Sequence, residues 1–493
     1  MTPKILLFPV KTIPDSGDFG NFSCKLTAGV LLPVMFILLP LKLNIMTIYS
    51  VRSWCIYLFM ILVIAACSKE DQAPQKPTIA AAELTPQTNA AAAIPVSWYQ
   101  LEFKLIRETP GFSPPVAARA LAYTGVALHE AVIWSDRYGH SLSGQLDGLS
   151  NVPRPEWGKR YNWELVANSA MADIIKSLYP NASAANLALI ATLDSTNKAT
   201  ASGSCGADEI NRSVNFGKQV AAAIYTWSTT DGGKDGYLNN FPTDYIPPVG
   251  PAFWVPTPPA FQRAMLPYWG NNRLMVRPRQ PETAGIAHPA FSTDTASAFY
   301  KAAYFVYNKV NTLTPEENLI ARYWADGGGT FTPPGHMLAI TSQLVVDNGL
   351  SLTEAAKLFA QTGIGENDAA IVCWKYKYKY NLLRPITYIQ TYIAAGWNSL
   401  IGTPPFPSYT SGHATFTSAA GNILADYFGG GYAFTDNQKV AEGFAPRAFN
   451  GFQQMVDEAS ISRVYGGIHY QFDSQVGAQT GRDIALRVLS LRY

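Results

Sequence analysis

The sequence has few charged residues and few cysteines, and each shortage removes a class of function. Only 15% of its 493 residues are charged, and the formal net charge is +2. A nearly neutral chain without a basic block gives no electrostatic basis for binding nucleic acid. The five cysteines form no CxxC pair and no zinc-ligand spacing, so a structural zinc site is not expected. Cys205 and Cys373 are expected to be separate buried thiols rather than a disulfide.

Alternating strand patterns, glycine-rich nucleotide loops and nucleophile elbows are also lacking. The chain does have 48% hydrophobic residues, enough for a large core, and many apolar patterns with helical spacing. We predict an all-α fold built from helical bundles, arranged as two four-helix units with long ordered loops. Residues 229–290 contain few periodic runs, and a loop of this length is often functional.

The N-terminal region resembles a secretory signal. Met46 is followed by Arg52, an apolar run over residues 55–64 and then Cys67. The ending IAAC resembles a bacterial lipobox, which implies cleavage before Cys67 and acylation of its thiol. A plain membrane anchor is the alternative, although the apolar run is short for a spanning helix.

These features divide the chain into four parts. Residues 1–45 are interpreted as a mis-assigned translation start, 46–67 as the lipoprotein signal, 68–95 as a flexible tether and 96–493 as the functional domain. No long apolar run is expected after the signal. The protein is therefore predicted to be exported and held at the outer membrane or cell envelope only by its lipid.

The first candidate motif is WKYKYKYNLLRP, which ends at Pro385. This proline is expected to end a helix near Arg384. Lys377 lies seven residues before Arg384 and therefore on the same helical face, whereas Lys375 and Lys379 point elsewhere. The motif could place two cations around an anion, or it could be only a solvated basic helix.

The second motif is PSYTSGHATF. A helix is expected after Gly412, and its N-terminus offers free N–H groups and the positive end of the helix dipole to an anion. Ser411 adds a hydroxyl group, and His413 adds an imidazole that titrates near neutral pH. Alternatively, Ser411 is only an N-cap and His413 is an ordinary surface residue.

The third motif is ASISRVYGGIHYQFDSQ. Arg463 precedes a Gly-Gly break, His469 follows it, and Asp473 lies one helical turn after His469. A carboxylate that holds one imidazole nitrogen leaves the other free to attack or to ligate, although the pair could also be structural. Together the three motifs supply three cations, a hydroxyl, a helix N-terminus and two histidines. This set suits a tetrahedral oxyanion.

The ordered pattern Lys-x6-Arg-Pro, Pro-Ser-x-x-Ser-Gly-His and Ser-Arg-x5-His-x3-Asp resembles the shared signature of vanadium-dependent haloperoxidases and type 2 phosphatidic acid phosphatases. Here it spans Lys377–Pro385, Pro407–His413 and Ser462–Asp473. Thr410 stands where the phosphatase signature usually has proline. The active site is therefore expected within residues 374–473.

The resemblance implies a role for each residue. It implies that His469 bonds to vanadium or attacks phosphorus, that Asp473 orients His469, and that His413 moves protons. It also implies that the oxyanion contacts, besides His469, are Lys377, Arg384, Ser411, the Gly412 N–H and Arg463.

Features outside the motifs favour a haloperoxidase. The expected domain has no spanning helices, unlike lipid phosphatases, and is longer than small secreted acid phosphatases. Trp374 and Phe406 stand where haloperoxidases place aromatic residues beside the halide, although both could be core residues. We therefore expect vanadate as the cofactor and oxidation of a halide by hydrogen peroxide to hypohalous acid, which a small organic acceptor could receive.

Two other functions stay open. One is a secreted acid phosphatase with a phosphohistidine intermediate, and the other is a non-catalytic oxyanion-binding protein. Two further histidines are expected to have structural roles. His129, followed by Glu130, lacks the second histidine of a zinc-protease helix and is expected on a helix surface or in the core, and His336 is expected near a helix cap, where it could line the entrance.

Overall fold

The computed structural model describes residues 86–278 and 288–493. The chain divides into two compact units, Met1–Ile79 and Ala80–Tyr493, and the described residues all belong to the second. The predicted extension, the predicted signal and Cys67 lie outside the described residues.

The boundary predicted for the tether is partly wrong. Helix α2 (Pro86–Glu108) includes the last ten residues of the predicted tether, 86–95. The reason is that Ala92 and Ile94 are buried against the rest of the unit, so this short apolar stretch has a partner that a tether would not have.

The all-α prediction is confirmed. Thirteen α-helices and two short strands account for the regular structure of the described residues, apart from short 3₁₀ turns. After α2, the helices are α3 (Pro114–Val132), α4 (Trp163–Leu178), α5 (Ala184–Ser202), α6 (Ala207–Ser228), α7 (Ala298–Asn311), α8 (Pro315–Tyr323), α9 (Thr332–Asp347), α10 (Leu352–Tyr380), α11 (Pro385–Tyr392), α12 (Gly412–Phe428), α13 (Phe452–Tyr465) and α14 (Gln471–Leu489).

The strands β1 (Phe434–Asp436) and β2 (Arg447–Phe449) were not predicted. They pair antiparallel, with Phe434 opposite Phe449. Both rings pack into the main hydrophobic cluster, so three residues per strand suffice because the core rather than a wider sheet stabilises the pair.

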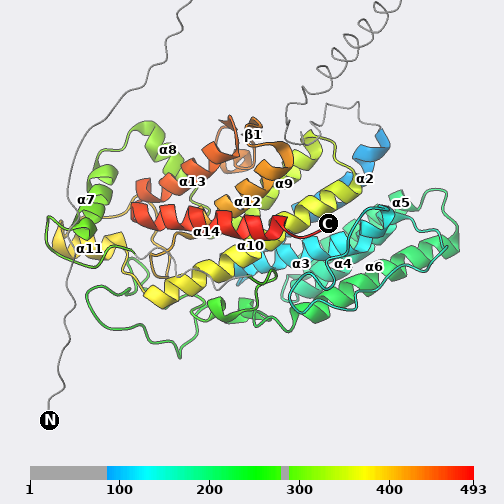
Figure 1. Ribbon diagram of the computed structural model, residues 1–493, viewed down its shortest axis with the longest axis horizontal. Coiled ribbons are helices and arrows are strands. Elements are labelled where there is room, and N and C mark those ends of the chain that lie inside the picture. The colour runs from blue at the N-terminus through cyan, green and yellow to red at the C-terminus, as the bar shows by residue number, and fades with distance from the viewer. Residues whose placement is uncertain (1–85, 279–287) are drawn as a thin grey trace, which may run out of the picture. The chain divides into compact units, whose positions relative to one another are not determined.

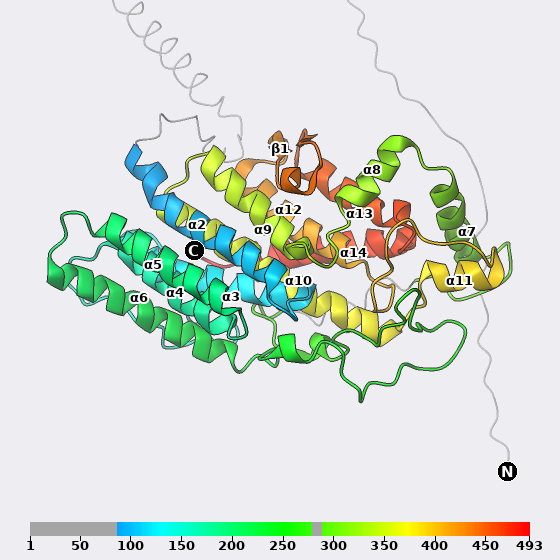
Figure 2. The same ribbon diagram turned by 180° about the vertical axis from the view of Figure 1, so that it is seen from behind.

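The helices form two groups, as predicted. Helices α3, α4, α5 and α6 pack together, and α10, α12, α13 and α14 form the second group. Figure 1 shows the first group at one end of this unit, and α10 extends from there toward α7 and α11 at the other end. Figure 2 shows α2 and α9 on the opposite face. Because α3 packs along α10, one hydrophobic cluster runs through both groups.

One described helix contradicts the expectation that no long apolar run follows the signal. Pro114–Ser135 is long and apolar enough to cross a membrane, with a mean hydropathy of 1.2 over its 18-residue window. That entire window is buried inside the structure. It packs between α4 and α10, and a helix that is apolar on all sides is expected in such a position.

Two local features position the C-terminal motifs. A capping box starts α10, with the Ser351 N–H donating to Glu354 and the Glu354 N–H donating to the Ser351 hydroxyl. At the other end of α10, the long loop packs against the chain that follows the helix. The Trp254 N–H donates to the Asn381 carbonyl at 2.7 Å, and the Leu383 N–H donates to the Ala252 carbonyl at 3.0 Å.

Candidate active site

Lys377 reaches the interior from the last turns of α10. It is fully buried, whereas the other two lysines of the motif are exposed. Its ammonium group donates to the backbone oxygens of Pro407 at 3.0 Å, Ser408 at 3.1 Å and Thr410 at 2.6 Å. These three acceptors match the three N–H donors of a lysine.

The helix ends before the predicted position. Helix α10 stops at Tyr380, and Asn381 follows with a left-handed φ of 48°. Arg384 is therefore the N-cap of α11, and the argument that it shares a helical face with Lys377 is wrong. The two cations still meet, because both lie over the ring of Phe406, at 4.8 Å for Lys377 and 5.0 Å for Arg384.

Arg384 is buried and only partly paired. Its Nε donates to the Phe406 carbonyl at 2.8 Å, and its Nη1 donates to the Ile468 carbonyl at 2.7 Å. Nη1 also lies 3.1 Å from Nε2 of His469. Nη2 is buried and has no hydrogen-bond partner among the described residues. Burial lowers the pKa of Arg384 to about 9, so the group is still a cation at neutral pH.

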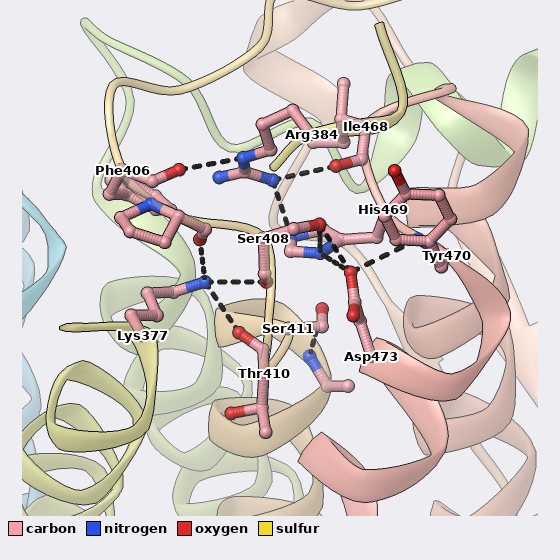
Figure 3. Close-up of polar contacts among 12 residues, drawn as sticks. Lys377, Arg384, Phe406, Ser408, Thr410, Ser411, Ile468, His469, Tyr470 and Asp473 are labelled. Carbon is pink, nitrogen blue, oxygen red and sulfur yellow. Dashed lines mark hydrogen bonds and ion pairs between the residues drawn. The ribbon is translucent and has the colours of Figure 1, made fainter. Parts of the chain in front are cut away.

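Asp473 holds His469 as predicted. Its Oδ2 lies 2.9 Å from Nδ1 of His469 and accepts from the Ser408 hydroxyl at 2.5 Å and the Tyr470 N–H at 3.2 Å. Figure 3 shows these groups converging on Asp473, with Lys377 on the other side of Ser408. These partners assign the proton to Nδ1 and leave the lone pair on Nε2.

Electrostatics keep His469 neutral. Burial, then the charges of Arg384 and Lys377, lower the pKa of His469 well below its usual value. Sequence reasoning missed Ser408 as the second partner of Asp473, although its motif was identified. Nothing local in the sequence relates two residues 65 positions apart.

Helix α12 begins at Gly412 as predicted, and Ser411 has the N-cap role that was the alternative expected for it. Ser411 is the N-cap, and its hydroxyl accepts from the Ala414 N–H at 3.5 Å. His413 is not an ordinary surface residue, because it lines an internal cavity and its Nε2 is buried without a partner in the described part of the chain. Burial and then the charge of Arg463 lower the pKa of His413 well below its usual value.

Arg463 approaches the same cavity from the end of α13. Its Nη1 donates to the Trp324 carbonyl at 2.6 Å, while its Nε is buried and unpartnered within residues 86–278 and 288–493. Burial lowers the pKa of Arg463 to about 10, so the side chain is a cation at neutral pH.

The cavity has a volume of about 530 Å³, and its wall includes the Gly412 position, His413, Arg463 and His469. Trp374 and Phe406 line it as well, with ring centroids 5.0 Å apart. We name the polar residues that the three motifs bring together at this wall and directly behind it the anion cluster. Its members are Lys377, Arg384, Ser411, Gly412, His413, Arg463, His469 and Asp473.

The anion cluster can bind a tetrahedral oxyanion. Arg384 and Arg463 each retain an unpaired buried N–H, and a buried unpaired donor is costly unless a ligand uses it. His469 presents a neutral nitrogen, and the α12 N-terminus adds the positive end of a helix dipole. Two cations, an unprotonated imidazole nitrogen that now faces Arg384, and a helix N-terminus match the charge and the acceptor oxygens of vanadate or phosphate.

A second buried group of charges lies next to this site and was not predicted. His336 is fully buried rather than at the entrance, with Nδ1 3.1 Å from Asp326 and Nε2 2.8 Å from Asp436. Lys439 pairs with Asp326 at 2.5 Å. We name these four residues the carboxylate–histidine cluster. The interpretation of His336 as a cap-region histidine missed partners as far as 100 residues away.

Two smaller predictions concern residues away from the site. His129 and Glu130 are buried in the core, one of the two positions expected for them. Cys205 and Cys373 are free thiols, as expected, but only Cys373 is buried.

Comparison with known proteins gives consistent results. Residues 357–492 match the family model of the VCPO second helical-bundle domain. The chain is similar to vanadium chloroperoxidase of Curvularia inaequalis, with 23% identity over 496 residues, covering 79% of this chain and 80% of that protein.

Two solved structures are also similar to this chain. The crystal structure of the first bacterial vanadium-dependent iodoperoxidase superposes with a TM-score of 0.72 at 32% identity, covering 80% of this chain and 95% of that chain. A holo-type bacterial vanadium-dependent chloroperoxidase has a TM-score of 0.61 at 16% identity. The match covers 77% of this chain and 92% of that chain. At that identity the likeness concerns the fold alone.

Proposed function

This chain belongs to the vanadium haloperoxidase family, and from that premise we propose that it uses vanadate to oxidise a halide ion with hydrogen peroxide. The observation that carries the proposal is the set of buried, unpartnered nitrogens, Arg384 Nη2, Arg463 Nε and His413 Nε2, beside the oriented His469. In the overall reaction, hydrogen peroxide, a halide ion and a proton give hypohalous acid and water.

The residues present fit vanadate. Arg384 and Arg463 would hold its oxygens through their unpaired N–H groups, His469 would bind it through Nε2, and Ser411 and the Gly412 N–H would contribute from the α12 N-terminus. When bound, vanadate supplies a Lewis acid that activates hydrogen peroxide without a change in its own oxidation state.

Lys377 makes hydrogen bonds other than the oxyanion contact that the resemblance implies. Its three N–H groups already donate to backbone carbonyls, so it contributes mainly a buried positive charge. A direct contact to an oxyanion would require one carbonyl to be exchanged. Burial lowers the pKa of Lys377, and a nearby anion would favour its protonated form.

His413 can move the proton that the reaction requires. Burial and the charge of Arg463 keep the ring neutral, so the unpartnered Nε2 can accept a proton from hydrogen peroxide and return it to the departing water. Trp374 and Phe406 form an apolar wall beside these groups. Such a wall removes water from an entering halide and thereby favours its oxidation.

The first experiment compares oxidation with phosphate-ester hydrolysis. The purified protein would be assayed for iodide and bromide oxidation by hydrogen peroxide, with and without orthovanadate, beside hydrolysis of p-nitrophenyl phosphate. We expect oxidation that depends on vanadate and is lost in His469→Ala. The exposed His140 offers a matched control, because the side chain of His140 lies outside the anion cluster.

The same experiment tests the phosphatase alternative. Ester hydrolysis that vanadate inhibits, with no oxidation of either halide, would establish a phosphatase in which His469 Nε2 attacks phosphorus. Binding of vanadate without either activity would leave an oxyanion-binding protein.

We also propose that the protein is exported and anchored by a lipid on Cys67. The support is the signal layout that ends in IAAC. Expression in a bacterium with labelled palmitate should place the label on the wild type but not on Cys67→Ala. An unlabelled wild-type protein of full length would contradict the proposal.

A further inference from the structure

Exposed hydrophobic side chains gather on the long loop between α6 and α7. Of the seventeen large hydrophobic side chains that are exposed in the described residues, seven lie within residues 238–268. Val249 is 95% exposed, Ile246 82%, Leu238 73% and Phe261 63%. Single exposed apolar residues are normal on a protein surface, but a group of them marks an interaction site. We name residues 238–268 the apolar loop.

The two arms of the apolar loop lie side by side. The Leu266 N–H donates to the Asn240 carbonyl at 2.7 Å, and the ring centroids of Tyr245 and Tyr268 are 6.1 Å apart. These contacts bring the arm with the exposed aliphatic side chains against the arm with the exposed Phe261. Figures 1 and 2 both show this green segment along the lower edge of the unit, below α10.

The inner side of the apolar loop is fixed to the rest of the unit. Trp254 and Leu266 are buried. The Tyr378 hydroxyl on α10 donates to the Met265 carbonyl at 2.6 Å, and the Met265 N–H donates to the Pro405 carbonyl at 2.9 Å. The outer side chains are therefore held in place before a partner arrives, and a preformed surface loses less conformational freedom on binding.

The charges beside the apolar loop are mainly positive. Arg263 within the loop is exposed, as are Lys375 and Lys379 on α10, whereas the loop contains a single carboxylate, Asp244. The 3₁₀ turn Trp269–Asn271, which directly follows the loop, packs against α10. Both lysines therefore border the apolar loop, and three cations face one anion there.

Neighbouring ion pairs leave this positive excess unchanged. Lys234 pairs with Asp235 at 3.9 Å, and Arg277 pairs with Asp147 at 2.6 Å. The surface thus combines aliphatic side chains, which have no hydrogen-bonding groups, with a cationic border. A lipid bilayer with anionic headgroups offers both an apolar interior and a negative surface. A second copy of the chain fits less well, because a twofold axis would place the same cations opposite one another.

We propose that the apolar loop docks the protein on a lipid bilayer that carries anionic headgroups. The cations beside the loop lie at the level of the headgroups. The side chains that enter the boundary between headgroups and acyl chains are those of Leu238, Ile246, Val249 and Phe261. This contact depends neither on halide oxidation nor on a lipid at Cys67.

Co-sedimentation with vesicles measures the contact directly. The protein is the chain from residue 67 onward with Cys67→Ala, which contains the whole compact unit Ala80–Tyr493 and carries no attached lipid. The vesicles consist of phosphatidylcholine with about one third phosphatidylglycerol. We expect this protein to bind the vesicles, and to bind less as the salt concentration rises.

A double variant tests the apolar loop itself. Ile246→Ser combined with Val249→Ser should weaken vesicle binding at least about tenfold, because two apolar side chains no longer leave water. Both side chains are more than four-fifths exposed, so the substitutions should leave the fold intact. Arg263→Gln should weaken binding about fivefold at low salt, because it removes a cation from the headgroup level.

Matched controls lie on other helices. Val346→Ser combined with Leu486→Ser removes exposed aliphatic side chains from α9 and α14, 56% and 62% exposed. Lys198→Gln removes an exposed cation from α5. Both controls should keep vesicle binding within about twofold of the wild type.

Three results would overturn this inference. One is the absence of wild-type binding to the anionic vesicles. Another is equal binding by the wild type and the loop double variant, since a different surface would then make the contact. The third is a dimer in solution that the double variant dissociates, which would assign the surface to a second copy of the chain. Halide oxidation should be the same in all these variants, so failure of the proposed function would leave this inference unaffected.

Discussion

His336 and His469 are both buried histidines that carboxylates hold, yet their surroundings differ in charge. Both ring nitrogens of His336 face carboxylates, those of Asp326 and Asp436. For His469 one nitrogen faces Asp473 and the other faces Arg384. Burial disfavours the charged form of each ring, but only His336 has enough nearby anions to overcome this cost.

The pKa values follow from this difference. Although burial alone would lower it, the charges of Asp326 and Asp436 raise the pKa of His336 to about 9. The pKa of His469 is lowered well below its usual value by burial and by Arg384 and Lys377. His336 is therefore a cation paired with carboxylates, and His469 is neutral inside a cluster with an excess of cations.

The two clusters differ in whether their buried charges satisfy one another. In the carboxylate–histidine cluster, Asp326 and Asp436 pair with Lys439 and the protonated His336, and Glu442 pairs with Lys439 as well. The anion cluster instead retains unpaired N–H groups on Arg384 and Arg463 within the described residues. Buried charges that satisfy one another stabilise the fold, whereas buried donors without acceptors are suited to an anion that binds later.

The largest expected effect concerns stability. His336→Ala should lower the free energy of unfolding by about 3–5 kcal/mol, because it leaves Asp326 and Asp436 buried without their shared partner. His413→Ala should cost less than about 1 kcal/mol, because its Nε2 has no partner among the described residues. Urea unfolding of both variants measures the difference. Equal losses would contradict the separation of the two clusters.

The second prediction concerns pH. The pKa of His336 is raised in the folded protein, so its stabilisation is complete below the unfolded pKa of about 6.5 and is lost as pH rises through about 9. The loss should be roughly 3 kcal/mol between these values. Unfolding midpoints of the wild type at pH 6.5 and 9.5 should differ much more than those of His336→Gln. A parallel decline in both proteins would contradict the assignment of a charged His336.

The third prediction tests whether the unpaired donors hold an anion. Orthovanadate at about 100 times its Kd should stabilise the wild type by about 2.7 kcal/mol and raise its Tm. Arg463→Gln should lose most of this increment. Arg447→Gln, which removes an arginine paired with Glu458 outside the anion cluster, should keep it. A full increment in Arg463→Gln would mean that vanadate binds elsewhere.

The smallest expected effect concerns orientation. Asp473→Asn keeps the shape of the side chain but weakens its hold on Nδ1 of His469, so kcat/KM for halide oxidation should fall about 10- to 100-fold. The affinity for vanadate should fall in parallel, and a thermal shift measures this without turnover. Asp368→Asn is the control, because Asp368 is a buried carboxylate that accepts from Met275 and Val276 outside the cluster. Activity lost equally in both would indicate a general effect on folding.

Local patterns in the sequence determined the helices and most of the site residues. Apolar spacing indicated the helices, and Ser351 and Ser411 mark where two of them begin. Such caps are readable from the sequence because a capping side chain bonds a residue only three positions away. The four-residue spacing of His469 and Asp473 predicted their contact, although His469 lies just before α14 and not within a helical turn. The turn of one helix directs Lys377 away from the neighbouring lysines, as expected, although the face that it was expected to share with Arg384 does not exist.

Only the tertiary structure determined how these parts meet. The left-handed Asn381 ends α10 before Arg384, and the long loop that pairs with the following residues orients the chain there. The carbonyls that hold Lys377, the bond from Ser408 to Asp473 and the partners of His336 all join segments 10 to 100 residues apart. Sequence spacing determines contacts within a helical turn, whereas contacts between distant segments depend on how the helices pack, and packing depends on the whole core.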